Sequence, residues 1–220
     1  MNVIAAIYQE NEDHARMINT GLKALKAALK VTTIINKQTS EIAELQNTTI
    51  IKNTENCLAM AWNTGLESVF AQGAQYAFVS GVDSRPPAKI DLYKMISILT
   101  DTKCGLVACV ANATDNRVSH GDGSYSFFLI DKYAFAAVRF NEAFKPAYFE
   151  DNDHLERMWQ ANYVPKKISS TAFAHLGQGT VKLGNEIKNK YSEYMQKNLE
   201  LFQQIHGFTP PHLPKNIKFN

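Results

Sequence analysis

Residues 76–84 read YAFVSGVDS, and the fold assignment starts from this short run. Tyr76–Val79 is apolar and ends close to Gly81, which predicts a buried β-strand followed by a turn. Asp83 stands directly after that strand. Ligands of α/β proteins bind outside the carboxyl ends of the strands, so we expect Asp83 to face a binding crevice.

Strands alternate with helices over the first half of the chain. Apolar and β-branched runs predict strands at 3–8, 31–35, 48–51, 76–79 and 105–111, and apolar residues at helical spacing predict helices at 11–29, 56–72 and 86–99. The buried stripe expected for the last of these helices is Ile90, Tyr93, Ile96 and Leu99. This alternation indicates an α/β unit whose mostly parallel sheet is covered by helices on both faces.

The second half of the chain is more irregular. Residues 112–123 are polar and contain two glycines, which predicts a mobile loop, and a strand is expected at 124–130. Beyond it we expect a helix at 151–161 and extended chain at 163–174. A long helix is expected at 184–206, with a stripe of Ile187, Tyr191, Met195, Leu199, Phe202 and Ile205.

An acidic cluster stands where the 151–161 helix begins. Residues 148–153 read YFEDND, so two aromatic side chains precede a run of carboxylates. Carboxylates that enter a partly dry cleft have raised pKa values and can act as bases. Together with Asp83, this cluster indicates a site that binds a metal-diphosphate and activates a hydroxyl group.

Composition is that of an ordinary globular protein. Of 220 residues 45% are hydrophobic, but no run of 18 apolar residues occurs, so we expect no membrane insertion. Three cysteines, at 57, 104 and 109, have no metal-ligand spacing, and the start does not resemble a signal peptide. Both observations favour a cytoplasmic location, the host cytoplasm if the protein is viral. The net charge of +2 excludes little, although residues 166–220 hold eight Lys against three Glu.

Four segments carry a family resemblance when they are taken in order. They are the opening strand 3–8, the stretch from Asn56 to Asn63-Thr64-Gly65, the run 76–84, and 148–153 followed by Arg157, His175-Leu176-Gly177 and Thr180. In that order they resemble the GT-A-fold glycosyltransferases, especially the inverting family 2 type.

The resemblance implies an α/β architecture of the GT-A (nucleotide-diphospho-sugar transferase) fold, with a single Rossmann-like mixed sheet flanked by helices. It also implies a domain over residues 1–207. A nucleotide-sugar-binding half at 1–111 is then followed by an acceptor-side half at 112–207 and a tail at 208–220.

The same resemblance implies roles for individual residues. Asp83 and His175 would hold Mn²⁺ or Mg²⁺. Asp151 would be the general base for the acceptor hydroxyl, with Glu150 as its competitor. The residues expected to contact the donor are Tyr8, Asn36, Asn63, Asp83 and Arg157.

The chain departs from the family pattern at two positions. Gly81 stands where the first acid of the metal motif is usual, and Asn36 stands where an Asp often reads the nucleotide base. Several candidates also have structural alternatives. These are a turn for Asp83, a helix N-cap for Asp151 and an ion pair between Arg157 and Asp153.

These patterns predict a metal-dependent, inverting transferase that moves a sugar from a nucleotide donor, a UDP-sugar by the resemblance, to an acceptor hydroxyl. The acceptor is a glycan, a small molecule or a hydroxylated DNA base, and the basic C-terminal portion keeps DNA among these. Two rivals are a sugar nucleotidyltransferase and a non-catalytic nucleotide-sugar- or glycan-binding module, the latter favoured by Gly81. A nucleotidyltransferase needs a Gly-rich phosphate loop after the first strand, whereas residues 8–20 contain no glycine.

Overall fold

The computed structural model of the chain describes residues 1–9, 11–100, 103–175 and 185–211. Its elements follow the predicted alternation closely. In chain order they are β1 (Asn2–Tyr8), α1 (Glu12–Lys26), β2 (Lys30–Lys37), η1 (Ala43–Asn47), β3 (Thr49–Lys52), α2 (Leu58–Ala71), β4 (Tyr76–Ser80), β5 (Ser84–Arg85), α3 (Lys89–Leu99), β6 (Leu106–Val110), η2 (Ser124–Ser126), β7 (Phe127–Asp131), α4 (Lys132–Ala137), α5 (Glu150–Gln160), β8 (Lys166–Ser169), β9 (Ala174–His175) and α7 (Asn185–His206).

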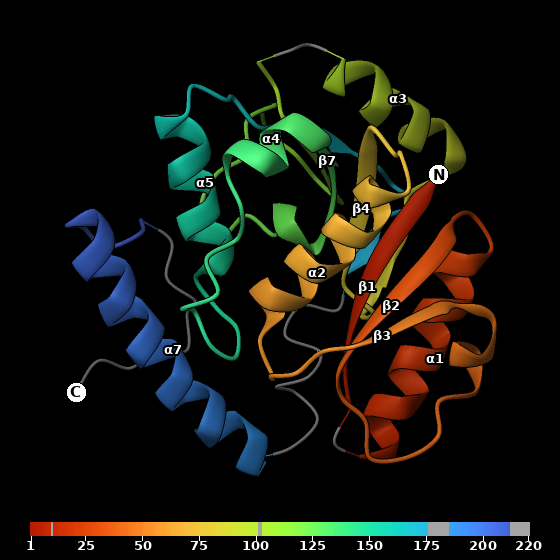
Figure 1. Ribbon diagram of the computed structural model, residues 1–220. Coiled ribbons are helices and arrows are strands. Elements are labelled where there is room, and N and C mark those ends of the chain that lie inside the picture. The colour runs from red at the N-terminus through yellow and green to blue at the C-terminus, as the bar shows by residue number, and fades with distance from the viewer. Residues whose placement is uncertain (10, 101–102, 176–184, 212–220) are drawn as a thin grey trace.

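A seven-stranded mixed sheet runs through the molecule in the order β3-β2-β1-β4-β7-β6-β8 (Figure 1). β1 pairs in parallel with β2 and with β4, whereas β7 is antiparallel to both of its neighbours, β4 and β6. β5 and β9 form a separate two-stranded sheet. The predicted class, one Rossmann-like mixed sheet flanked by helices, is confirmed.

Helices cover both faces of this sheet because its strands alternate their side chains between two apolar clusters. In β1, Val3, Ala5 and Ile7 belong to the cluster formed with α1 and α3, while Ile4 belongs to the cluster formed with α2, α4 and α5. A third, smaller cluster joins α7 to the segment before α5.

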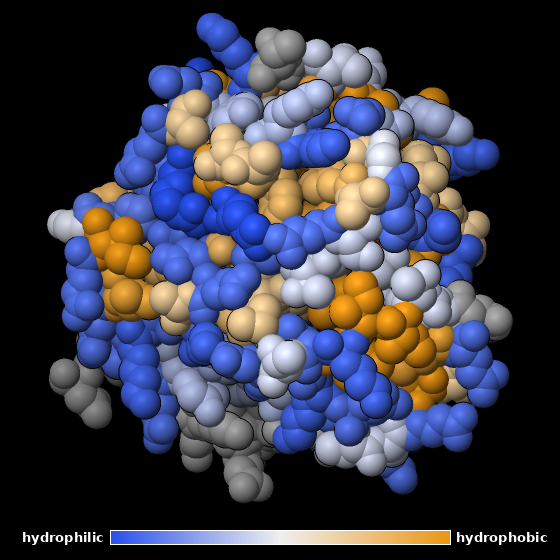
Figure 2. Space-filling model, viewed as in Figure 1, coloured by the Kyte–Doolittle hydropathy of each residue, from blue (hydrophilic) through white to orange (hydrophobic). Residues whose placement is uncertain are grey.

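The surface in the view of Figure 2 is mainly hydrophilic, and apolar residues gather over the strands at the β3 edge of the sheet. Ile50 of β3 is 47% exposed there. Within the described ranges, no helix has the length and apolar character needed to cross a bilayer.

The buried side of α3 differs from the prediction. Leu99 is buried and Ile96 packs against the core, as predicted. Ile90 and Tyr93 are instead 74% and 52% exposed, and Leu92 and Met95 are buried in their place. α3 is apolar on two sides, so helical spacing alone fits either stripe. Packing against the sheet decides between them.

The predicted stripe of α7 is confirmed over most of its described length. Tyr191, Met195, Leu199 and Phe202 are buried, but Ile205 is 45% exposed and was wrongly included. Other predictions concern residues or side chains outside the described part of the structure. These are Ile187, the Leu176, Gly177 and Thr180 part of the family resemblance, and the tail from residue 212 onward.

The polar segment 112–123, predicted to be a mobile loop, is tied to the rest of the fold. Val118 is buried, and the Lys167 Nζ atom lies 2.9 Å from a carboxylate oxygen of Asp122. His120 is also buried, with its Nε2 atom 2.6 Å from Glu156. Because these partners belong to β8 and α5, far along the chain, the local sequence gave no sign of them.

α1 approaches the segment after β4 at very close range. A Cβ atom added to Gly21, in the middle of α1, would lie 1.9 Å from the carbonyl oxygen of Val82. Glycine inside a helix costs about 1 kcal/mol relative to alanine, so the residue is explained by this contact and not by helix formation. The contact fixes the backbone next to Asp83.

Replacing Gly21 with alanine should therefore lower the free energy of unfolding by about 1–3 kcal/mol, although alanine is the better helix former. Chemical denaturation of the variant and the parent measures this change. Thr20→Ala is the matched control, because Thr20 is the exposed neighbour on the same helix. Equal stability of Gly21→Ala and Thr20→Ala would contradict the close approach of α1 to Val82.

Candidate functional site

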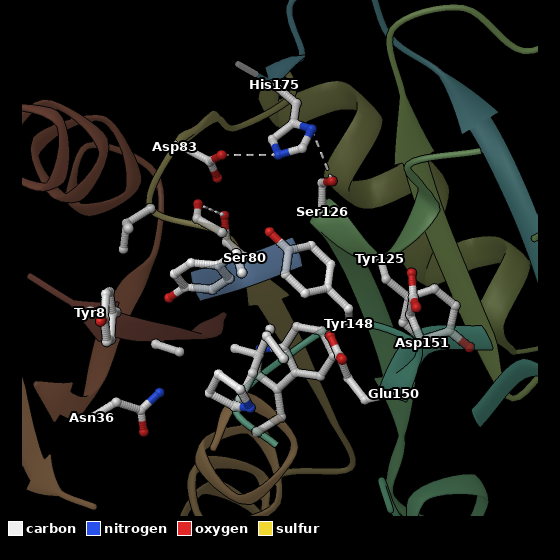
Figure 3. Close-up of a pocket in the computed structure, with 18 of the residues that line it drawn as sticks. Tyr8, Asn36, Ser80, Asp83, Tyr125, Ser126, Tyr148, Glu150, Asp151 and His175 are labelled. Carbon is white, nitrogen blue, oxygen red and sulfur yellow. Dashed lines mark hydrogen bonds and ion pairs between the residues drawn. The ribbon is translucent and has the colours of Figure 1, made fainter. Parts of the chain in front are cut away.

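A cavity of about 290 Å³ opens at the carboxyl ends of β1, β2 and β4 (Figure 3). Ligands of open α/β sheets bind where consecutive strands depart to opposite sides, and β1 is such a point because β2 and β4 flank it. Polar and aromatic residues dominate the lining. They are Tyr8, Asn36, Asn56, Trp62, Ser80, Asp83, Tyr125, Ser126, Tyr148, Glu150, Asp151, His175 and Tyr191, and Gly81 also lines the cavity.

Most of the residues predicted for the site meet in this cavity. Tyr8 and Asn36 lie at one end, and Asp83 and His175 lie along another wall (Figure 3). Glu150 and Asp151 also line it, although they are more than 60 residues from Asp83 in the sequence. The fold thus joins the two acidic segments that the sequence analysis singled out.

Two predicted donor contacts lie outside the described lining of this cavity. The Asn63 Nδ2 atom donates to the carbonyl oxygen of Phe140 at 2.9 Å and to Glu142 at 2.8 Å. The Arg157 guanidinium donates twice to Asp153, at 2.8 and 2.6 Å. Both side chains therefore hold the structure together here, and neither is carried into the proposed site.

The pairing of β5 with β9 brings His175 beside Asp83. Ser84 faces His175 across this short antiparallel ladder. The His175 Nε2 atom is 3.1 Å from the Asp83 carboxylate, and its Nδ1 atom is 3.1 Å from the Ser126 hydroxyl (Figure 3). Ser126 was missed by the sequence analysis, which placed it inside the strand expected at 124–130, whereas β7 begins only at Phe127.

Gly81 leaves the space that the Asp83 side chain uses. A Cβ atom at position 81 would lie 2.6 Å from the Asp83 Oδ1 atom. Because this oxygen ends a flexible side chain, a larger residue at 81 would push the carboxylate aside instead of breaking the backbone. The departure from the family pattern at position 81 thus shapes the position of the remaining acid.

Asp83 and His175 suit a divalent cation in a limited way. Carboxylate oxygen and imidazole nitrogen are both common ligands of Mn²⁺. Among the described residues, no group of three or more His, Cys, Asp or Glu side chains is arranged to hold a metal. The two residues therefore fit a cation that takes its other ligands from a bound diphosphate and water, as nucleotide-bound metals often do.

Glu150 is the buried acid of the cavity wall. It is the first residue of α5 and is 4% exposed, and its Oε2 atom has no hydrogen-bond partner among the described residues. Burial, and then the negative charge of Asp151, raises the pKa of Glu150 well above its usual range. Figure 3 shows its carboxyl group among the side chains that surround the cavity.

Asp151 is placed differently from its neighbour. Its Oδ1 atom accepts hydrogen bonds from the Asn152 backbone N–H at 2.8 Å and from the Asn152 Nδ2 atom at 3.2 Å. Burial raises the pKa of Asp151 as well. In Figure 3 it lies next to Tyr125.

A strained turn presents these two acids. Tyr148 and Phe149 have φ angles of 81° and 68°, in the left-handed region, where each non-glycine residue costs about 1–3 kcal/mol. The buried Asn198 of α7 holds the turn by donating from Nδ2 to the carbonyl oxygens of Ala147 at 2.8 Å and Tyr148 at 3.1 Å. α7 thus helps to hold the turn that leads into Glu150.

Tyr125 contributes only its ring to the cavity. His154 is buried, and this burial, followed by the charge of Arg157, lowers its pKa to about 3, so the imidazole is neutral. Its Nε2 atom lies 3.0 Å from the Val138 carbonyl and must donate there. Its Nδ1 atom therefore accepts from the Tyr125 hydroxyl at 2.8 Å, which turns that hydroxyl away from a ligand.

No protein-family model matches the chain, and no curated protein matches it in sequence. Solved structures do match it. A mannosyltransferase from Pyrobaculum calidifontis, in complex with GDP-Man and Mn²⁺, has a TM-score of 0.64 and 17% identity over 96% of this chain and 65% of that one. The present chain thus spans slightly less than two thirds of that enzyme.

Two further structures match with lower scores. A nucleotide-diphospho-sugar transferase from Desulfovibrio desulfuricans, so described, has a TM-score of 0.54 and 11% identity over 92% of this chain and 96% of that one. A 4-diphosphocytidyl-2C-methyl-D-erythritol synthase from Anaerococcus prevotii has a TM-score of 0.53 and 12% identity over 86% and 95%. The chain has the nucleotide-diphospho-sugar transferase fold. At these identities, the likeness establishes the fold alone.

The raised pKa of Glu150 predicts a pH-dependent effect of Glu150→Gln on stability. The folded state binds this proton more tightly than the unfolded state, where the pKa is about 4.3, so the side chain favours folding at low pH and disfavours it as the pH rises through the folded pKa. The melting temperature of Glu150→Gln relative to the parent should therefore increase from pH 4 to pH 8 in calorimetry. Glu67→Gln, at an exposed position, is the control for removing a carboxylate, and a flat difference for Glu150→Gln would contradict the buried acid.

Proposed function

We propose that this protein is a metal-dependent glycosyltransferase that moves a sugar from a nucleotide-diphospho donor to an acceptor hydroxyl with inversion. The observation that carries the proposal is that one cavity holds both the Asp83–His175 pair and the buried Glu150 carboxyl, whose Oε2 atom has no hydrogen-bond partner in the described part of the chain. The Asp83–His175 pair suits a cation with a diphosphate bound to it. The Glu150 carboxyl suits an acceptor hydroxyl that must lose its proton.

The arrangement of the cavity supports separate binding positions for the nucleoside and for the diphosphate of the donor. Tyr8 and Asn36 would receive the nucleoside, and Asp83 with His175 would hold the diphosphate through Mn²⁺ or Mg²⁺. A bound cation would neutralise charge on the leaving diphosphate. The solved mannosyltransferase with GDP-Man and Mn²⁺ shows that this fold accommodates such a donor.

Glu150 is the proposed general base. The acceptor O–H bond breaks and its proton passes to the Glu150 carboxylate, while the acceptor oxygen attacks the anomeric carbon from the side opposite the diphosphate, whose bond to that carbon breaks. A raised pKa suits a group that must take a proton near neutral pH. The sequence favours Asp151 for this role, but Asp151 already accepts two hydrogen bonds from Asn152. We propose that its charge helps to keep the pKa of Glu150 high.

The rival function, transfer of a nucleotidyl group, has less support at the start of the fold. β1 ends at Tyr8 and α1 begins at Glu12, so the connection is short, and residues 8–20 contain no glycine. Part of this connection is occupied by Gln9, whose Oε1 atom accepts from the backbone N–H groups of Thr39 at 2.7 Å and Ser40 at 3.0 Å. A loop that wraps a triphosphate needs more glycine and more free backbone N–H groups.

The acceptor of the proposed transferase is a glycan, a small molecule or a hydroxylated DNA base.

Donor binding should depend on Asp83 and on the cation. In the parent, nucleoside diphosphates with Mn²⁺ should raise the melting temperature, because binding to the folded state stabilises it by mass action, by about 2.7 kcal/mol at a hundredfold excess over Kd. Asp83→Asn should abolish the Mn²⁺-dependent part, and Gly81→Ala should reduce it because the new Cβ displaces the carboxylate. Asp13→Asn, on the exposed side of α1, is the control. Equal shifts in Asp83→Asn and the parent would remove Asp83 from the cation site.

Glu150 and Asp151 should separate in a turnover assay. Glu150→Gln removes the proposed base and should lower metal-dependent donor turnover, measured as sugar release to water or to an added acceptor, by about 10²–10⁴-fold while nucleotide affinity stays within a few-fold. Asp151→Asn should retain far more activity. If Asp151→Asn abolishes turnover and Glu150→Gln does not, Asp151 is the base.

A further inference from the structure

One end of the cavity is lined by an amide whose orientation is fixed by a chain of hydrogen bonds. The Asn53 Nδ2 atom donates to the Asn36 Oδ1 atom at 2.7 Å and to the carbonyl oxygen of Cys57 at 3.3 Å. A backbone carbonyl can only accept, so Asn53 must turn its NH₂ group toward Cys57 and, with it, toward Asn36. Asn36 must then present its oxygen to Asn53, and its own NH₂ group points the other way.

Figure 3 agrees with this direction. The Asn36 nitrogen lies on the side of Tyr8 and the cavity, and the oxygen lies on the far side. The cavity wall at this end therefore offers hydrogen-bond donors.

Secondary structure holds each member of this chain in place. The Asn53 backbone N–H donates to the Ile35 carbonyl at 2.9 Å, next to Asn36 in β2. Cys57 is the N-cap of α2, where its buried Sγ atom accepts from the Met60 N–H at 3.5 Å. The hydrogen bonds from Asn53 to Asn36 and Cys57 are thus anchored to β2 and α2. The Asn36 amide cannot turn into the opposite orientation without losing its hydrogen bond to Asn53.

An aromatic ring stands next to this amide. Tyr8, at the end of β1, lines the same end of the cavity as Asn36 (Figure 3). Its ring is held by Tyr191, edge-on at 6.2 Å, and by the Lys37 Nζ atom at 5.6 Å from the ring centre. A fixed aromatic face beside fixed hydrogen-bond donors is suited to a flat heterocycle that stacks on the ring and is recognised at its edge.

We propose that Asn36, locked by Asn53, selects nucleotides whose base has an acceptor nitrogen at the centre of its pairing edge. Cytosine N3 and adenine N1 are such acceptors and would receive a hydrogen bond from the Asn36 NH₂ group. Uracil and guanine carry a ring N–H at the same place, which would face the amide N–H. A base held in that position would leave both donors unsatisfied, and only a shifted base could offer a carbonyl oxygen instead. This inference rests on the proposed nucleotide-sugar donor, and it points away from the UDP-sugar that the family resemblance implies.

The first test compares CDP, ADP, UDP and GDP, each with Mn²⁺, by isothermal titration calorimetry on the full chain. CDP, ADP or both should bind about tenfold more tightly than UDP and GDP. The comparison of CDP with ADP tells whether the recognised base is a pyrimidine or a purine. Tighter binding of UDP or GDP than of both CDP and ADP would overturn the inference.

The second test changes the direction of the amide without changing a residue of the cavity. In Asn53→Asp the carboxylate only accepts, so Asn36 should turn its NH₂ group toward position 53 and its oxygen toward the ligand. The preference should then shift toward UDP and GDP. Asn36→Asp should produce the same shift directly. Thr54→Asp places the same charge at the exposed neighbouring position and should keep the parental order of affinities.

These outcomes separate the inference from the proposed function. If all four diphosphates bind with the cation but with equal affinity, the base selection is wrong and the donor site stands. If none of them binds to the parent, the inference and the proposed function both fail. If Asn53→Asp keeps the parental order while Asn36→Asp changes it, the locking role of Asn53 is overturned.

Discussion

The parallel pairing of β1 on both of its sides is the constraint from which the site follows. With β2 on one side and β4 on the other, three carboxyl ends lie next to one another, and the chain must leave them in different directions. The antiparallel β7 then places its amino end beside the carboxyl end of β4, where Phe127 pairs with Ser80. This is why Tyr125 and Ser126, which precede β7, share a cavity with residues that follow parallel strands.

The wall of the cavity that we propose to face the acceptor carries features that disfavour folding. It combines a buried acid, Glu150, with two non-glycine residues in the left-handed region, Tyr148 and Phe149. Such features persist only where neighbouring structure over-determines them. Asn198 and the apolar contacts of Phe202 with Phe149 provide that support from α7, which also lines the cavity with Tyr191.

The sequence predicted the features that depend on local patterns. Alternating apolar runs predicted the strands and helices. Acids next to those runs, Asp83 and Glu150 among them, were predicted site residues and line the cavity. The sequence favoured Asp151 over Glu150 as the base. Our proposal of Glu150 depends instead on its burial and on the hydrogen bonds that Asp151 accepts from Asn152, and no local sequence pattern shows these. Periodicity failed on α3, which is apolar on two sides, and no local signal could show the hydrogen bonds that join residues of β2 to the start of α2.

Gly81 also limits how this protein can change over evolutionary time. A second acid at position 81 would restore the more familiar metal motif, yet its first carbon would occupy the place of the Asp83 carboxylate. The gain of one acid would therefore displace the other, because the segment around Val82 that carries Asp83 is held by α1 at Gly21. The two positions depend on each other, and the order in which substitutions arise decides which of them are tolerated.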